Sequence, residues 1–83
     1  MTTQYTLKTA NGHEVSAICW TSNTLNFQII VDGSLYDEGS SMKCHGWGQE
    51  EEAKHQATQT AEDIDSGRLV KVGDGWKLAE EAA

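Results

Sequence analysis

The stretch LNFQIIVDGSLYD, residues 25–37, decides the fold that the sequence predicts. Apolar side chains recur at every second position from Leu25 to Val31, which is the pattern of a β-strand with one buried face. Asp32-Gly33 follows directly, and this dipeptide is typical of a tight hairpin turn. The chain then returns in a shorter strand over 34–37. This segment therefore predicts an antiparallel hairpin.

Two more strands are predicted upstream of this hairpin. A short run that contains Tyr5 and Leu7 ends at Asn11-Gly12, a dipeptide that favours a type I′ turn because both residues tolerate positive φ. The next strand, over 14–20, places small apolar residues on one face. The polar residues 21–24 form the turn that leads into the strand at 25.

Downstream, the period changes from two to that of a helix. Over 49–66 alanines recur at 53, 57 and 61, followed by Ile64, so that they form one stripe of an α-helix. Gly67 stands where a C-terminal helix cap is expected. Strands are predicted over 68–72 and 76–78, joined by a turn at 73–75. The last residues, 79–83, have little to bury and are expected to be frayed.

The element order β-β-β-(β)-α-β-(β) predicts an α+β fold, an antiparallel sheet of four to six strands with one helix packed on one face. Eighty-three residues allow one domain, here 1–78, followed by the tail 79–83. The helix leaves the other face of the sheet open, and Ile18, Trp20 and Ile30 lie on or near it. These three residues either pack in the core or form an exposed patch for a partner or a second copy.

Negative charge is concentrated in the predicted helix. The chain has a net charge of −7, from 13 acidic against 6 basic residues, which argues against direct binding to nucleic acid or to an anionic membrane. Residues 50–65 hold six acids against one lysine, a net charge of −5. The helix dipole stabilises the acids of the first turn, but it disfavours Glu62, Asp63 and Asp65 near the end. Acids placed against the dipole suggest a binding role.

The helix is therefore expected to present an acidic ridge to a basic protein surface, such as one that evolved to bind nucleic acid. Trp47, between two glycines in a loop of about ten residues, is the expected anchor. Alternatively, its indole folds back over the start of the helix. The residues predicted to contact the partner are Glu51, Glu52, Glu62, Asp63, Asp65 and Trp47, with Tyr36, Asp37 and Glu38 as weaker candidates.

No arrangement in the sequence predicts catalysis, a metal or a cofactor. Cys44 and His45 are adjacent, but the paired spacing of a zinc site and a base positioned beside a nucleophile are both missing. Cys19 and Cys44 are expected to be reduced, although a single disulfide between them is left open. The first five residues do not resemble a signal peptide and no apolar run is long enough to span a bilayer, so a cytoplasmic location is expected.

A compact, acidic, proline-free α+β chain with an acidic helix and turn-rich strands resembles the phage-encoded anti-CRISPR proteins in size, charge and architecture. The resemblance implies an inhibitor in the bacterial cytoplasm that binds a CRISPR–Cas surveillance complex directly and blocks its access to DNA. The charge of −7 is modest beside the most DNA-like members of that class. Two alternatives are a homo-oligomeric structural or accessory domain that pairs through its open sheet face, and an antitoxin-like partner of a basic protein. A monomer and a homodimer both remain open.

Overall fold

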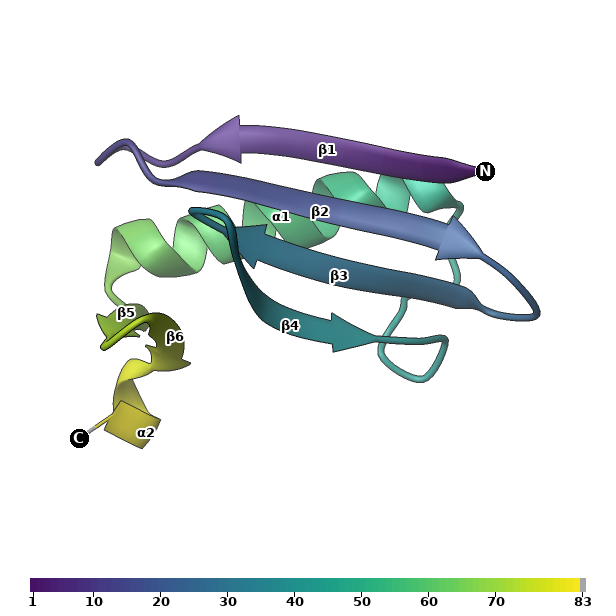
Figure 1. The fold of residues 1–83 in the computed structure, drawn as a ribbon. Helices are drawn as coiled ribbons and strands as arrows, with labels where there is room; N and C mark the ends of the chain where they lie inside the picture. Colours follow the sequence, from purple (N-terminus) through teal and green to yellow (C-terminus); the bar gives the residue numbers. More distant parts are fainter. Residues whose placement is uncertain (83) are drawn as a thin grey trace.

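The computed structural model describes residues 1–82 and confirms an α+β fold (Figure 1). An antiparallel four-stranded sheet in the order β1-β2-β3-β4 packs against one long helix, α1, and β5 and β6 form a separate two-stranded sheet. The bounds are β1 Thr2–Lys8, β2 Glu14–Thr21, β3 Leu25–Val31, β4 Ser34–Gly39, α1 Gln49–Ser66, β5 Leu69–Val72, β6 Gly75–Leu78 and α2 Ala79–Ala82. The main sheet thus has the smallest strand number that the sequence predicted.

The two predicted hairpin turns differ in conformation. Between β3 and β4, both Asp32 and Gly33 have positive φ, of 50° and 84°, as a two-residue type I′ turn requires. Between β1 and β2, Gly12 has a φ of 86° but Asn11 does not have a positive φ, and the connection spans residues 9–13. The predicted type I′ turn is wrong there, because Thr9 closes a longer loop by hydrogen bonding to the backbone N–H of His13.

A β-bulge interrupts the pairing of β3 with β4. Ile30 lies opposite Leu35, but Ile29 lies opposite Asp37, so Tyr36 is an extra residue on β4. Leu35 precedes the bulge and lies on the face of the sheet that carries Ile30. Tyr36 turns to the other face, where it packs half-buried against the core.

The core lies between α1 and the sheet, as the alanine stripe predicted. Ala53 and Ala57 have no exposed surface, and their short side chains allow α1 to lie close to β1 and β2. At the start of α1, the side chain of Gln49 accepts a hydrogen bond from Thr3 and donates one to Thr21, which fixes the helix to both strands. The buried apolar residues of the strands are Val15, Ala17, Cys19, Phe27, Ile29, Val31 and Leu69.

The second sheet extends the same core at the C-terminal end of α1 (Figure 1). Gly67 ends the helix with a φ of 83°, and its N–H bonds to the carbonyl oxygen of Ile64. Leu69 is buried, and Trp76 and Leu78 pack against the core from β6. Residues 79–82, expected to be frayed, form one helical turn, α2, whose first N–H donates to the carbonyl oxygen of Arg68. Residue 83 lies outside the described residues.

Candidate functional site

The loop between β4 and α1, residues 40–48, holds the candidate site. Two hydrogen bonds within the loop make it compact, from Lys43 N–H to the Ser40 carbonyl oxygen at 2.7 Å and from Cys44 N–H to the Ser41 carbonyl oxygen at 3.3 Å. The Lys43 ammonium also lies 3.4 Å from Oδ1 of Asp37, which ties the loop to β4. The loop is therefore folded back on the sheet before α1 begins.

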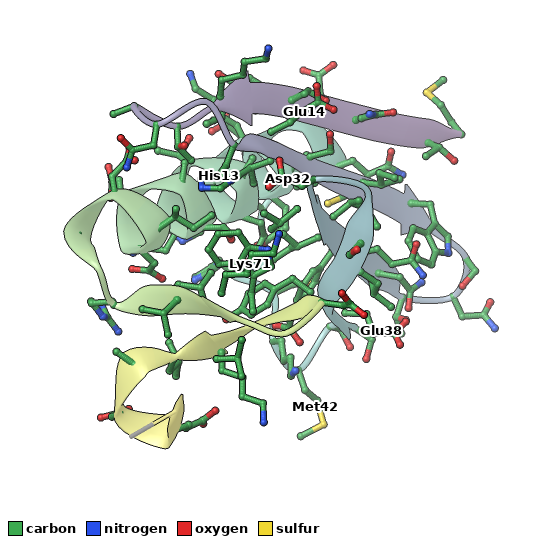
Figure 2. The ribbon with its side chains drawn as sticks, turned by 60° about the vertical axis from the view of Figure 1, so that its left-hand side comes forward. His13, Glu14, Asp32, Glu38, Met42 and Lys71 are labelled. Carbon is green, nitrogen blue, oxygen red and sulfur yellow. The ribbon has the colours of Figure 1, made fainter. Side chains whose placement is uncertain are left out.

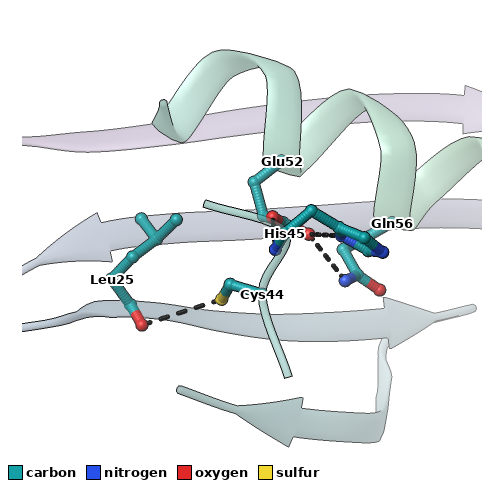
Figure 3. Close-up of polar contacts among 5 residues, drawn as sticks. All are labelled: Leu25, Cys44, His45, Glu52 and Gln56. Atoms are coloured by element: carbon teal, nitrogen blue, oxygen red, sulfur yellow. Dashed lines mark hydrogen bonds and ion pairs between the residues drawn. The ribbon is translucent and has the colours of Figure 1, made fainter. Parts of the chain in front are cut away.

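The buried carboxylate of Glu52 holds this loop against α1 (Figure 3). His45 donates its backbone N–H to Oε1 of Glu52 at 2.9 Å, and Nδ1 of the His45 ring lies 3.1 Å from Oε2. Gln56, one turn further along the helix, donates to Oε2 at 2.8 Å. Glu52 was predicted to contact a partner; that prediction is wrong, because the side chain has no exposed surface and all its bonds are internal.

Glu52 carries its charge in a buried position. Burial alone would raise its pKa, but the hydrogen bonds from the His45 backbone, from Gln56 and from the His45 ring outweigh burial and hold the pKa below its ordinary value of 4.5. Burial, with Glu52 and Cys44 nearby, raises the pKa of Cys19 to about 11. Burial and Glu52 also raise the pKa of the Cys44 thiol, which bonds to the carbonyl oxygen of Leu25. Both thiols are therefore protonated at neutral pH.

Trp47 is the exposed end of an aromatic cluster. Its indole stacks on the His45 ring, with centroids 4.6 Å apart and planes 17° from parallel. His55 of α1 meets both rings edge-on, at 4.6 Å from His45 and 5.1 Å from Trp47. Trp47 nevertheless remains 45% exposed. The indole thus folds over the first turns of α1, as the second alternative predicted, and it still presents about half of its surface.

Two adjoining hollows lie beside this indole. The first, of about 280 Å³, is lined by Trp47, Glu51, Lys54, His55 and Thr58. The second, of about 400 Å³, shares Glu51 and Lys54 with the first, and Thr3, Gln4, Tyr5 and Glu50 complete its lining. We call the residues that line these two hollows the Trp47 surface. It combines exposed aromatic rings with carboxylates.

The acids near the end of α1 are bonded within the protein. Asp65 accepts the backbone N–H of Ala10 at 3.1 and 3.3 Å through its two carboxylate oxygens. Asp63 accepts a hydrogen bond from Gln59 and lies 3.5 Å from the Arg68 guanidinium. The continuous acidic ridge is therefore broken. Among the acids predicted to contact a partner from the helix, Glu51 and Glu62 are exposed without these internal bonds.

The three weaker candidates on β4 lie in different surroundings. Tyr36 packs against the core. Its pKa is raised, mainly by this burial and further by the negative charges of Asp37, Asp63 and Glu81. The Asp37 carboxylate pairs with the loop lysine described above. Glu38 is exposed, and Gln28 of β3 donates to its carboxylate at 3.5 Å. The cross-strand pair of Glu38 and Gln28 belongs to the open face of the sheet, away from α1.

A second histidine–carboxylate pair joins the two turns at the other end of the sheet. Nδ1 of His13 lies 2.7 Å from Oδ2 of Asp32, and Oδ1 of Asp32 accepts the Glu14 N–H at 2.9 Å. The pKa of Asp32 is lowered, first by the hydrogen bond from the Glu14 N–H and then by the His13 ring and the positive charge of Lys71 on β5. Figure 2 shows these residues. The edge of the His13 ring also meets Trp76, with centroids 5.0 Å apart. This pair connects the main sheet with the second sheet.

The sequence did not predict the role of His45, which pairs with Glu52 and stacks on Trp47. From the sequence, His45 is considered only together with Cys44, as a metal ligand or as a base beside a nucleophile. The His45–Glu52 pair has the donor and acceptor of a catalytic histidine–carboxylate dyad. A dyad needs a nucleophile beside the ring, whereas the Cys44 thiol is protonated and bonded to Leu25. The pair is therefore best interpreted as the support of Trp47.

Comparison of the chain with protein-family models, with curated proteins and with solved structures finds no match. Over residues 1–82 we find no group of three or more His, Cys, Asp or Glu side chains arranged to hold a metal ion. No helix in that part of the chain combines the length and the apolar character that crossing a membrane requires.

Proposed function

We propose that the protein is a small inhibitory binding protein, not an enzyme, that covers a basic surface of another protein by direct contact. The observation that carries the proposal is the state of Trp47, which is 45% exposed and yet held in one orientation by His45. Tryptophan is enriched among the residues that dominate binding energy at interfaces. An indole that is already oriented loses less conformational entropy when a partner binds.

The charge around Trp47 favours a basic partner. Glu50 and Glu51 line the two hollows and are exposed, against the single ammonium of Lys54. Glu62 adds an exposed carboxylate further along α1, and the whole chain carries −7. Carboxylates form charge-assisted hydrogen bonds with lysine and arginine, the residues that contact phosphates in nucleic-acid-binding proteins. The partner is a protein with an exposed basic groove, and the chain binds neither nucleic acid nor a membrane directly.

A CRISPR–Cas surveillance complex in the bacterial cytoplasm is the first partner to test. Support for it comes from the resemblance in size, acidic charge and α+β architecture to phage-encoded anti-CRISPR proteins. A complex of this kind holds nucleic acid in a positively charged channel, which supplies the basic groove that the Trp47 surface needs. The protein acts there by occupying the channel entrance, and it needs no cofactor.

The test measures binding to purified surveillance complexes of several types and the competition with their DNA target. We expect Trp47→Ala to weaken binding about thirtyfold, as the loss of an anchor of about 2 kcal/mol does. Met42→Ala is the matched control, because Met42 is an exposed apolar residue of the same loop that is 96% exposed. We expect this control to bind as the wild type does.

A charge-reversal pair tests the electrostatic part of the proposal. Glu51→Lys with Glu62→Lys should weaken binding at low salt about tenfold, and the loss should shrink as salt screens the charges. Asp74→Lys with Glu80→Lys changes the net charge equally at exposed positions away from the Trp47 surface and is expected to bind normally. Binding that neither Trp47→Ala nor the Glu51→Lys, Glu62→Lys pair affects would reject the Trp47 surface. Failure of the wild type to bind any surveillance complex would reject this partner class.

A further inference from the structure

The open face of the main sheet carries an apolar stripe. The strand register places Ile18 and Trp20 next to each other along β2, and Ile30 diagonally across from Ile18 on β3. Leu35 of β4 lies directly opposite Ile30. Helix α1 lies behind the sheet in Figure 1, on the opposite face. We call these four residues the open-face stripe.

The stripe is most exposed at Leu35 of β4. The two-residue turn at Asp32 and Gly33 places Leu35 opposite Ile30 on the open face, where it is 50% exposed. The other three residues of the stripe are half-buried by their neighbours in the sheet. The stripe therefore runs from one end of β2 to the first half of β4 as a connected apolar surface.

Charge is absent from the centre of this face, although 23% of the chain is charged. Around the stripe the register places six uncharged polar residues, Thr2, Gln4, Thr6, Ser16, Asn26 and Gln28. The charged residues of the face lie at its rim, with Lys8 opposite Glu14 at one end and Glu38 at the edge strand. An apolar centre without charge inside a polar rim is the composition of a protein–protein interface.

We propose that this face is the interface of a homodimer, in which two copies pack sheet against sheet. The centre of the open face has no carboxylates, so it offers no ion pairs to a basic partner. The surface that complements it must therefore be uncharged and apolar. A second copy of this face meets that requirement, because a twofold interface places the same patch on both subunits. Two twisted sheets of this kind pack about 10 Å apart, with strands crossing at about −30°.

The size of the face indicates a weak dimer. Four strands about 4.8 Å apart and seven residues at about 3.3 Å each cover about 440 Å² per copy. Stable complexes bury about 800 Å² per partner, so this interface is about half that size and falls among weak, transient contacts. We expect a dissociation constant on the order of 10–100 μM. Apart from Gln4 of β1, the Trp47 surface lies on the α1 side and stays accessible in such a dimer, so this inference does not depend on the proposed function.

Sedimentation equilibrium over about 1 μM to 1 mM protein tests the proposal, with the expected constant near the middle of that range. The wild type should show a reversible monomer–dimer equilibrium that added salt strengthens slightly, because salt screens the repulsion of two chains of charge −7. Leu35→Glu should weaken it at least tenfold. Val72→Glu is the control, with the same change of charge at a position that is 42% exposed on β5.

Leu35→Lys separates the stripe from the overall charge. This substitution makes the net charge of the chain less negative. It would therefore strengthen an association limited by overall repulsion, but it should weaken a dimer that buries the stripe. Far-UV circular dichroism verifies that each variant is folded. A wild type that stays monomeric up to 1 mM overturns the proposal. A dimer that both Leu35 variants leave intact also overturns it, and would place the contact elsewhere, for instance at the free edge of β1.

Discussion

The carboxylate of Glu52 determines how the loop of residues 40–48 presents Trp47. It accepts hydrogen bonds from the backbone N–H of His45 and from the Gln56 amide, and it faces the His45 ring. The Glu52 side chain itself has no exposed surface. A buried acceptor that loses its donor costs about 1–3 kcal/mol, so the buried Glu52 carboxylate penalises any position of the loop that removes the His45 bonds. The exposed indole is thus held by a side chain that no partner touches.

We expect Glu52→Gln to lower the free energy of unfolding at pH 7 by about 1–3 kcal/mol, because glutamine has one acceptor oxygen and turns an N–H toward the Gln56 donor. The native pKa of Glu52 lies below 4.5, so its stabilisation is complete above that pH and is lost as the pH falls through the native value. The difference between wild type and variant should therefore shrink on acidification. Urea unfolding from pH 7 to pH 3 measures it.

Glu51→Gln is the control for this experiment, since Glu51 is the exposed neighbour of Glu52 in the same helical turn. Its effect should stay within about 0.5 kcal/mol at every pH. A constant difference between wild type and Glu52→Gln down to pH 3 would mean that the Glu52 carboxylate is not the group that titrates.

Acidic residues lie near the C-terminal end of α1, where the helix dipole disfavours negative charge. The dipole of a helix disfavours negative charge in the last turn by about 0.3–1 kcal/mol. Asp65 compensates by accepting the Ala10 N–H, which fixes the turn between β1 and β2 to the end of the helix, and Asp63 compensates by pairing with Arg68. Two of the three misplaced acids thus have a structural role, and Glu62 is left as the one that fits a binding role.

The two kinds of acid should respond differently to the same charge reversal. Glu62→Lys should raise the free energy of unfolding by about 0.3–1 kcal/mol, because it satisfies the dipole and breaks no described bond. Asp65→Lys should lower it by about 0.5–1.5 kcal/mol, because the lost bonds to Ala10 outweigh the gain. Urea unfolding at neutral pH compares them. Equal effects would show that the Asp65 bond contributes nothing in solution.

The elements of the fold could be predicted because each follows a local period. Alternation predicted the bounds of β3 to the residue, and the alanine stripe with Gly67 did the same for α1. The sequence did not predict the burial of Glu52. Glu52 and Thr60 are buried beside the alanines, with the half-buried Gln56 between them, and this spacing of four residues places Glu52 on the inward side of α1 in spite of its charge.

The molecule as a whole depends on contacts that no local pattern predicts. Asp65 with Ala10, and His13 with Asp32, join residues that lie 55 and 19 positions apart in the chain. β5 and β6 pair locally as a hairpin, but no local pattern predicts that they form a sheet of their own beside the main sheet. The positions of the strands and of α1 could be predicted, but α2 and the partners of the polar side chains could not.

The second sheet should unfold together with the rest of the molecule. Leu69 is 2% exposed and belongs to the same core as the main sheet, so Leu69→Ala should lower the free energy of unfolding by about 2–4 kcal/mol. Val72→Ala on the same strand, 42% exposed, should cost less than about 0.5 kcal/mol. Tryptophan fluorescence and far-UV circular dichroism should give one coincident transition; two separate transitions would mean that residues 67–82 unfold alone.

The extra residue in β4 also limits how copies of the chain can join. Growth into a fibril by adding strand to strand requires two regular outer strands on every copy, so that each added copy offers a new template. The outer strand β1 is regular over its whole length, but the other outer strand is bent at Tyr36. Strand addition would therefore stop after one pair of copies, which protects a small, sheet-rich protein from open-ended aggregation.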